Sequence, residues 1–147
     1  EEALPTAPKI LELKKRMNRN IPILTGLGAL YGLFDLQAGS DGFNTGFAFP
    51  EVLIALVHAK ASNNWELANR LYRYFLPLIV FEQQPSIAIR KEIFRIRGAI
   101  HHSTVRHPGA SISQSTKSQL HDLISNTLQD LDLSKPIPDT LMTKIIY

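Results

Sequence analysis

The sequence predicts an α/β protein, because its first third reads as two successive strand–helix units. The apolar run at residues 21–25 is typical of a buried parallel strand, and it stops at Gly26. Apolar residues then recur at helical spacing until Gly39, which can close a helix in a left-handed conformation. A second short strand is predicted over residues 42–46, and Pro50 stands where the next helix would begin. Two such units in succession indicate a parallel sheet.

The carboxyl ends of the two predicted strands are the expected binding positions. In parallel α/β sheets, ligands bind beyond the carboxyl ends of the strands. The residues at these ends are Thr25 and Gly26 after the first strand, and Asn44, Thr45 and Gly46 after the second. We therefore expect a binding site to include these positions.

Helices are predicted on both sides of these units. The first is expected to begin at Thr6, with its hydroxyl as the N-cap. Asn63 and Glu66 have the spacing of a capping box, which predicts another helix start, and a later amphipathic helix is expected from Ser113 or Ser115. The expected divisions are residues 1–61 with the strand–helix units, residues 62–133 as a helical extension, and residues 134–147 as a peripheral tail.

Composition narrows the class of function. The chain has 147 residues, of which 44% are hydrophobic and 20% charged, as in an ordinary soluble globular domain or part of one. The absence of cysteine excludes disulfides, thiolate catalysis and cysteine zinc sites. No apolar run reaches the ~18 residues that a membrane span needs, and no signal peptide is recognisable. We therefore expect a cytoplasmic protein without a membrane partner.

The formal net charge of +3 is weak evidence for a polyanionic partner. Arg90, Lys91, Arg95 and Arg97 recur about one helical turn apart, which could form a nucleic-acid patch. This spacing is more typical of a solvated helix face, and we expect no nucleic-acid partner. The chain begins with Glu1 and not with methionine, for which a processed or excised segment is the simplest explanation.

The order of these elements, together with their residues, resembles the C-terminal portion of the dihydrodipicolinate synthase and N-acetylneuraminate lyase superfamily. The matching segments are LTGLGAL at the seventh strand, AGSDGFNTG at the eighth strand, the helix start at Phe49–Pro50, the helix NNWELANRLYRYFLPLI and the closing helix IAIRKEIFRIRGAI. The resemblance extends over roughly residues 1–110. Each segment is weakly specific alone, but the order and spacing together are specific.

The resemblance implies a fold and a chemistry. Members of the superfamily are lyases, aldolases and dehydratases built on a TIM (β/α)8 barrel with extra C-terminal helices, so residues 1–61 would be the last β/α units of such a barrel. They hold a 2-keto acid, often pyruvate, as a Schiff base on a lysine at the end of strand six, because an iminium is a better electron sink than a ketone. No cofactor is implied. The parent enzyme is expected to be a homo-oligomer, a dimer or a tetramer, as family members commonly are.

The resemblance also implies that the catalytic lysine lies just before Glu1. The chain would then contain no catalytic residue and would lack the N-terminal half of the barrel. We therefore expect the chain alone to be inactive and marginally stable, because two strands cannot close a barrel and their edges need a partner.

Three substrate-binding positions follow from the resemblance. Gly26 corresponds to the glycine that leaves room beside the iminium, and Asn44 to the residue whose backbone carbonyl faces the active site. Thr45 corresponds to a hydroxyl residue that contacts substrate in the sugar-acid branch. Asn44 and Thr45 can equally be small polar residues that close a tight strand end.

Two further features bear on the substrate. The acidic residues that bind substrate hydroxyls in the sugar-acid branch are replaced by Gly28 and Ala29, which argues against a sialic acid. The stretch RGAI…VRHP, residues 97–108, is more similar to 2-keto-3-deoxy sugar-acid dehydratases than to the lysine-pathway synthases.

Other residue types could carry chemistry, and each has a plainer interpretation. The candidates are Lys9, Lys60, Lys91, His101, His102 and His107. The lysines fall on predicted helices and not at strand ends, where a solvated role is more typical than a lowered pKa. The histidines have no acidic residue at ligand spacing, so we expect no metal site.

A non-enzymatic helical interaction module is the alternative function. In that hypothesis the strand–helix segment is incidental, and the chain is a stable monomer without an exposed sheet edge.

Overall fold

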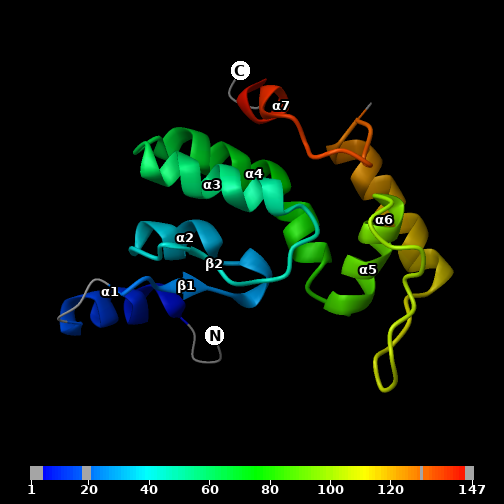
Figure 1. Ribbon diagram of the computed structural model, residues 1–147, viewed down its shortest axis with the longest axis horizontal. Helices are drawn as coiled ribbons and strands as arrows, with labels where there is room; N and C mark the ends of the chain where they lie inside the picture. The colour runs from blue at the N-terminus through cyan, green and yellow to red at the C-terminus, as the bar shows by residue number, and fades with distance from the viewer. Residues whose placement is uncertain (1–4, 18–20, 130, 145–147) are drawn as a thin grey trace.

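The computed structural model describes residues 5–17, 21–129 and 131–144 of the chain. In chain order the elements are α1 (Thr6–Arg16), β1 (Leu24–Thr25), the 3₁₀ turn η1 (Leu27–Ala29), α2 (Gly32–Gln37), β2 (Gly42–Phe43), α3 (Pro50–Ala61), α4 (Trp65–Phe81), α5 (Ser86–Ile96), α6 (Gln114–Thr127) and α7 (Asp139–Lys144). The strands lie beside α1 and α2 at one end of the molecule, while α5 and α6 form the other end (Figure 1). Among the described helices, none has the length and apolar character that crossing a membrane requires.

The two strands pair in parallel, as the sequence predicts. Leu24 lies opposite Gly42, and Thr25 lies opposite Phe43. The N–H of Asn44 donates to the carbonyl of Thr25 (2.8 Å), which continues the pairing just past the end of β2. Each strand is shorter than predicted, with two residues in regular pairing. Within the described residues the sheet has two strands, so each is held along one edge only.

The helix after β1 begins later than the sequence predicts. Leu27, Gly28 and Ala29 have positive φ angles of 49°, 60° and 64°, so the chain makes a left-handed turn where helical spacing predicted a helix. The α-helix begins only at Gly32. Apolar spacing missed the turn because the contacts that hold it come from distant residues. At the other end of α2, Gly39 has the predicted left-handed conformation, with φ 107°.

Two predicted helix caps are wrong. The N-cap of α1 is Pro5, and the hydroxyl of Thr6 donates to Oδ1 of Asp35 (2.6 Å) and does not cap the helix. The N-cap of α4 is Asn64, whose side chain accepts a backbone N–H of the first turn. Asn63 instead takes a left-handed conformation with φ 54°. The side chain of Asn63 accepts a hydrogen bond from Nε1 of Trp65 (2.9 Å).

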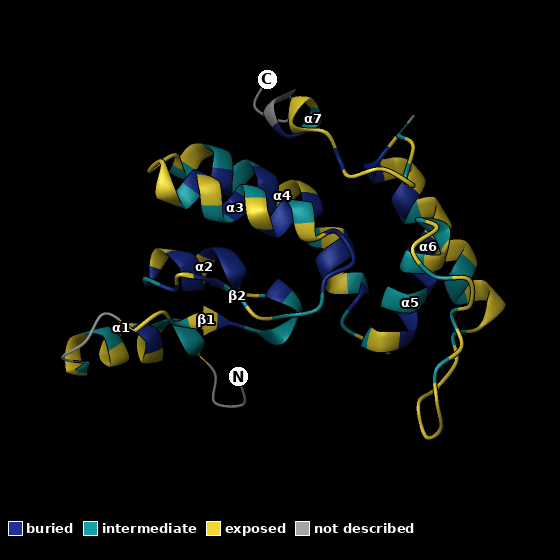
Figure 2. Ribbon diagram, viewed as in Figure 1, coloured by how far each residue is buried: buried dark blue, intermediate teal, exposed yellow. Residues whose placement is uncertain are grey.

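The main core forms where α3 packs on α4 and α4 on α6, and Figure 2 shows buried residues along these helices. Its largest fully buried apolar side chains are Phe49, Phe75, Leu56, Leu71, Leu78, Ile79 and Leu120, together with Leu36, Ile89 and Ile93. The predicted division after residue 61 falls in the turn between α3 and α4, although both helices contribute to one buried cluster. The helix predicted to start at Ser113 or Ser115 is α6, which begins at Gln114 with Ser113 as its N-cap.

The C-terminal segment packs on this core. Residues 134–147 were predicted to be a peripheral tail, but Ile137 and Met142 are only 5% and 4% exposed. The N–H of Ile137 donates to Oε1 of Glu51 on α3 (3.0 Å). The same carboxylate pairs with Nη2 of Arg97 (2.6 Å), so the tail, α3 and the end of α5 are joined at one point.

Candidate functional site

One face of the small sheet packs against α2, and the other face approaches α3 at the buried Gly42 but is open at Leu24 and Asn44. Thr25 and Phe43 lie opposite each other and face α2: the hydroxyl of Thr25 donates to Asp35, and the ring of Phe43 packs against the start of α2. Because neighbouring side chains of a strand point to opposite faces, Leu24 and Asn44 share the other face. Leu24 is 54% exposed and Asn44 is also exposed. The open face therefore combines an apolar side chain with a polar one.

Asp35 holds the carboxyl end of β1 from the covered side. It is 2% exposed and accepts hydrogen bonds from the hydroxyls of Thr25 and Thr6. These contacts tie β1 and α1 to α2. A buried carboxylate with both oxygens in hydrogen bonds is stabilised where it lies, so Asp35 fixes the strand end.

The side chain of Thr45 holds the turn that follows β1. Its Oγ1 accepts a hydrogen bond from the N–H of Gly28 (2.7 Å), which joins the two strand-end loops. The left-handed conformations of Leu27 and Ala29 cost about 1 kcal/mol each, so the turn needs such contacts. A hydroxyl that accepts one hydrogen bond can still donate its own proton. Thr45 can therefore hold the turn and donate to a ligand at the same time.

The three predicted binding positions thus lie at one end of the sheet. Gly26 follows β1 directly and opens the left-handed turn, while Asn44 and Thr45 follow β2. Asn44 is on the open face, and Thr45 connects the two loops. Their roles in binding stay a prediction.

The corner between α4 and α5, which comprises residues 82–90 and so includes the first turns of α5, covers both strand-end loops. A Cβ built on Gly28 would lie less than 3.0 Å from Nε2 of Gln83, and one built on Gly46 less than 3.0 Å from Nη1 of Arg90. Each glycine therefore leaves room for a long polar side chain from the corner. Gln83 was not predicted to lie near the site, and Arg90 was predicted only as part of a solvated basic helix face. The available signal was the glycine in each loop, because a glycine near a strand end often marks the close approach of another group.

Glu82 organises this corner. It is 2% exposed, and its Oε2 accepts a hydrogen bond from the N–H of Ala48 (2.9 Å) in the loop after β2. Its Oε1 accepts from Nε of Arg90 (2.7 Å). Burial raises the pKa of the Glu82 carboxyl, and its hydrogen bonds with Arg90 and Ala48 oppose that rise. One buried carboxyl group thus sets the position of the loop and of the guanidinium.

An apolar groove lies between α1 and β1. Its volume is about 540 Å³, and its lining is mostly apolar. The residues that line it are Thr6, Lys9, Ile10, Glu12, Leu13, Arg16, Ile23, Leu24, Thr25 and Gly26. Leu13 and Leu24 are 48% and 54% exposed there, so the groove exposes the kind of surface that another chain segment normally covers.

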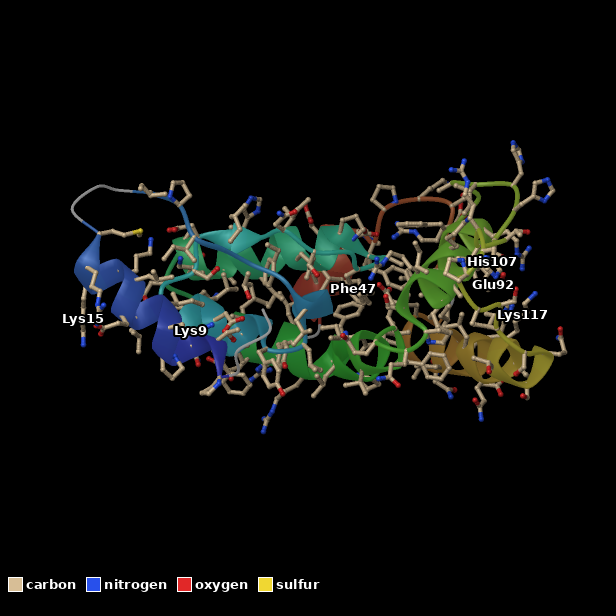
Figure 3. The ribbon with its side chains drawn as sticks, turned by 90° about the horizontal axis from the view of Figure 1, so that it is seen from below. Lys9, Lys15, Phe47, Glu92, His107 and Lys117 are labelled. Carbon is tan, nitrogen blue, oxygen red and sulfur yellow. The ribbon has the colours of Figure 1, made fainter. Side chains whose placement is uncertain are left out.

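Two of the alternative lysines, Lys60 and Lys91, lie away from the joined strand-end loops, whereas Lys9 is one of the residues that line the groove. The ammonium of Lys60 donates to the carbonyl of Ser40, which precedes β2 and so lies at the amino end of the sheet. The ammonium of Lys91 donates to the carbonyl of Thr104 in the loop after α5. Lys9 is on α1, along with Lys15 (Figure 3).

The histidines and most of the basic group lie at the opposite end. His101, His102 and His107 are exposed on the loop after α5, and Figure 3 shows His107 far from Lys9. Within the part of the chain that the structure describes, no group of three or more His, Cys, Asp or Glu side chains could hold a metal ion. The basic residues of and after α5 have protein partners: Arg90 with Glu82, Arg95 with Glu92, Arg97 with Glu51, and Lys91 with Thr104.

Two comparisons with known proteins find similar chains. Over 96 residues the sequence is 32% identical to L-2-keto-3-deoxyarabonate dehydratase of Azospirillum brasilense, a match that covers 65% of this chain and 31% of the dehydratase. A crystal structure of dihydrodipicolinate synthase from Rhodopseudomonas palustris matches with a TM-score of 0.79 and 33% identity, over 85% of this chain and 44% of the synthase. The chain therefore spans less than half the length of either protein. No protein-family model matches it.

Proposed function

The chain belongs to the dihydrodipicolinate synthase and N-acetylneuraminate lyase superfamily, and we propose that it is the C-terminal part of a Schiff-base-forming lyase, dehydratase or synthase. The proposed substrate is pyruvate or a 2-keto-3-deoxy sugar acid. The similarity to L-2-keto-3-deoxyarabonate dehydratase favours the sugar acid, because the name of that enzyme specifies a 2-keto-3-deoxy sugar acid. The likeness to both proteins exceeds 30% identity, which supports a shared chemistry as well as a shared fold.

The open face of the sheet is the observation that carries the proposal. Leu24 and Asn44 face outward from the two strands, beside an apolar groove of about 540 Å³. We propose that this face is the inner wall of a (β/α)8 barrel, whose other strands lie on the N-terminal half. A preceding strand would then occupy the groove and pair with the free edge of β1. Such packing would cover the apolar side chains and complete the ligand cavity.

In this proposal the residues of the chain shape the cavity and do not form the covalent bond. A lysine on the N-terminal half attacks the keto carbon, water leaves, and the resulting iminium accepts the electron pair of a broken bond at the neighbouring carbon. Gly26 leaves space beside the iminium, the backbone carbonyl of Asn44 faces the substrate, and the hydroxyl of Thr45 donates to it. We propose that the parent enzyme is cytoplasmic, homo-oligomeric and independent of cofactors.

Reductive trapping tests the proposal. The full-length protein, with the N-terminal half of the barrel, is incubated with pyruvate and borohydride, and the modified residue is located by mass spectrometry. We expect one covalent adduct, on a lysine that precedes Glu1. The 147-residue chain treated in the same way is the control and should remain unmodified.

Two results would contradict the proposal. An adduct on Lys9, Lys60 or Lys91 would place the nucleophile in this chain. Failure to trap an adduct with a panel of 2-keto acids would remove the Schiff-base chemistry altogether.

A further inference from the structure

We infer that Gln83 and Arg90, from the corner between α4 and α5, recognise the oxygen-rich end of the substrate that lies away from the keto group. This inference rests on the proposed function. It adds two specificity-determining residues that come from the helical extension and not from the strands.

The first observation is a matched pair of close approaches. In each strand-end loop, the space that a side chain would need at a glycine is taken by a polar side chain from the corner: Gln83 at Gly28, and Arg90 at Gly46. The glycines lie in separate loops, yet the polar groups come from one corner. The loops at these positions therefore contribute bare backbone, and the corner contributes the hydrogen-bonding groups.

The second observation is that both polar groups are held in place. Nε2 of Gln83 donates to the carbonyl of Ile79 (2.8 Å), one turn earlier, and to the carbonyl of Gly28 (3.5 Å) in the loop after β1. The guanidinium of Arg90 is fixed through its Nε by buried Glu82 (2.7 Å), and its Nη1 and Cζ lie against Gly46. Side chains locked in this way lose little freedom when they bind a ligand.

The third observation is the position of the corner relative to the open face. Gly28 donates its N–H to Thr45, and Gly46 is the residue after Thr45. Gln83 and Arg90 thus lie against the two loops that Thr45 joins, at the carboxyl end of the strands. Gln83 is partly exposed, and the Arg90 side chain is 23% exposed, so both are accessible from outside the core.

The chemistry of these groups defines the ligand. The terminal amino groups of the Arg90 guanidinium donate to oxygen acceptors, either hydroxyl groups or a carboxylate. The N–H groups of Gln83 already donate within the protein, so its Oε1 is the atom that can accept a hydrogen bond from a ligand hydroxyl. A 2-keto acid with such groups on carbons beyond the keto group would be preferred over pyruvate, which has only a methyl group there. The two sources of oxygen can be separated by the choice of substrate.

The test measures selectivity in the full-length protein. The readout is kcat/KM for a longer 2-keto acid divided by the rate constant for borohydride trapping with pyruvate. One longer acid is a 2-keto-3-deoxy sugar acid, which carries hydroxyls, and the other is a 2-keto dicarboxylic acid, which carries a carboxylate. The variants are Gln83→Ala and Arg90→Lys. The matched control is Arg95→Lys, because Arg95 is also on α5 and paired with a glutamate, Glu92.

We expect the selectivity ratio to fall about tenfold or more in both variants, for at least one of the longer acids, since each loses a hydrogen bond to an oxygen-bearing group. The control should keep the ratio of the unchanged protein. An unchanged ratio in Gln83→Ala and Arg90→Lys would overturn the inference. If Arg90→Lys does not fold, Gln83→Ala alone decides the outcome. Failure of the unchanged protein to trap pyruvate is a separate result, which would refute the proposed function and this inference with it.

Discussion

The sheet region, from α1 to β2, and the helical region, from α3 to α6, both contain buried and exposed apolar side chains, such as Leu36 at 1% exposure and Ile54 at 55%, but they differ in where the exposed ones lie. In the sheet region, Leu13 is 48% exposed and Leu24 is 54% exposed. In the helical region, side chains such as Phe75 are completely buried. The helical region therefore buries its own core. The sheet region displays apolar surface along the groove and along the edge of β1.

In the proposed barrel, this difference separates residues that stabilise the chain itself from residues that would be covered by the N-terminal half. Apolar burial is the main source of folding free energy, so a completely buried side chain contributes in the chain alone. An exposed leucine contributes little until another element covers it. Substitutions in the two regions should therefore differ in their cost to stability.

Phe75→Ala should cause the largest loss of stability. The phenyl ring is completely buried between α4 and its neighbours and makes an edge contact with Tyr74, so its removal leaves a cavity. We expect the free energy of unfolding to fall by about 3–5 kcal/mol, which urea denaturation followed by circular dichroism would measure. Phe34→Ala, at a ring that is 52% exposed on α2, is the matched control and should cost far less. Equal losses at the two positions would show that the helical core does not dominate stability.

Gly46→Ala tests the contact between the two regions. The new methyl group would meet the guanidinium of Arg90, and we expect a loss of about 1–3 kcal/mol from the forced shift. The loss should be smaller in an Arg90→Ala background, which a double-mutant cycle would measure. Gly42→Ala is the control, because a Cβ there would meet its nearest neighbour, a methyl group of Leu24, at 3.4 Å. Additive effects of Gly46→Ala and Arg90→Ala on the free energy of unfolding would mean that the close approach of Arg90 is not the cause of the loss.

The contact between Gly46 and Arg90 marks the limit of what could be predicted from the sequence. The parallel pairing of β1 with β2 and the meeting of Thr25–Gly26 with Asn44–Thr45 follow from local patterns, since parallel strands place their carboxyl ends together. The contacts of Gln83 and Arg90 could not be predicted in the same way. They depend on where a corner that lies 37 or more residues beyond Thr45 turns back in space.

Local patterns also failed where a distant partner competes with a near one. Thr6 has the sequence of an N-cap, but its hydroxyl bonds with Asp35 on another helix. The helical spacing after Gly26 is genuine, but the hydrogen bond between Gly28 and Thr45 accompanies a left-handed turn at that place. In both cases tertiary contacts outweigh local preferences of about 1 kcal/mol or less.

The pH dependence of stability should differ between buried and exposed carboxylates. In the helical region, hydrogen bonding to Arg95 lowers the pKa of Glu92 from 4.5 to about 2, and the Glu92 side chain is completely buried. Because the folded pKa is depressed, this contribution is complete above pH 4.5 and is lost as the pH falls toward about 2. In the sheet region, hydrogen bonding to Lys14 also lowers the pKa of Asp41, but the Asp41 side chain is 39% exposed, so solvent screens it.

Glu92→Gln and Asp41→Asn measure this difference. We expect Glu92→Gln to cost about 1–2 kcal/mol at neutral pH and progressively less as the pH falls through the window below 4.5. The cost of Asp41→Asn in free energy of unfolding should also decrease as the pH falls, but it should be smaller at every pH. Urea denaturation of both variants at a series of pH values supplies the comparison. A cost of Glu92→Gln that stays constant over the window would contradict the depressed pKa.

Leu24→Ser should have the smallest effect in the chain alone and a large effect in the full-length protein. Leu24 is 54% exposed, so its replacement should change the stability of the 147-residue chain by less than about 0.5 kcal/mol. In the proposed barrel the same side chain would lie against inner residues of neighbouring strands, where burying a serine and losing a leucine would cost about 2–5 kcal/mol. Denaturation of both proteins with and without the substitution gives the two values. If the costs are equal and small, the open face of β1 is not covered in the parent protein, and the difference between the two regions would be a property of the fold and not a consequence of missing polypeptide.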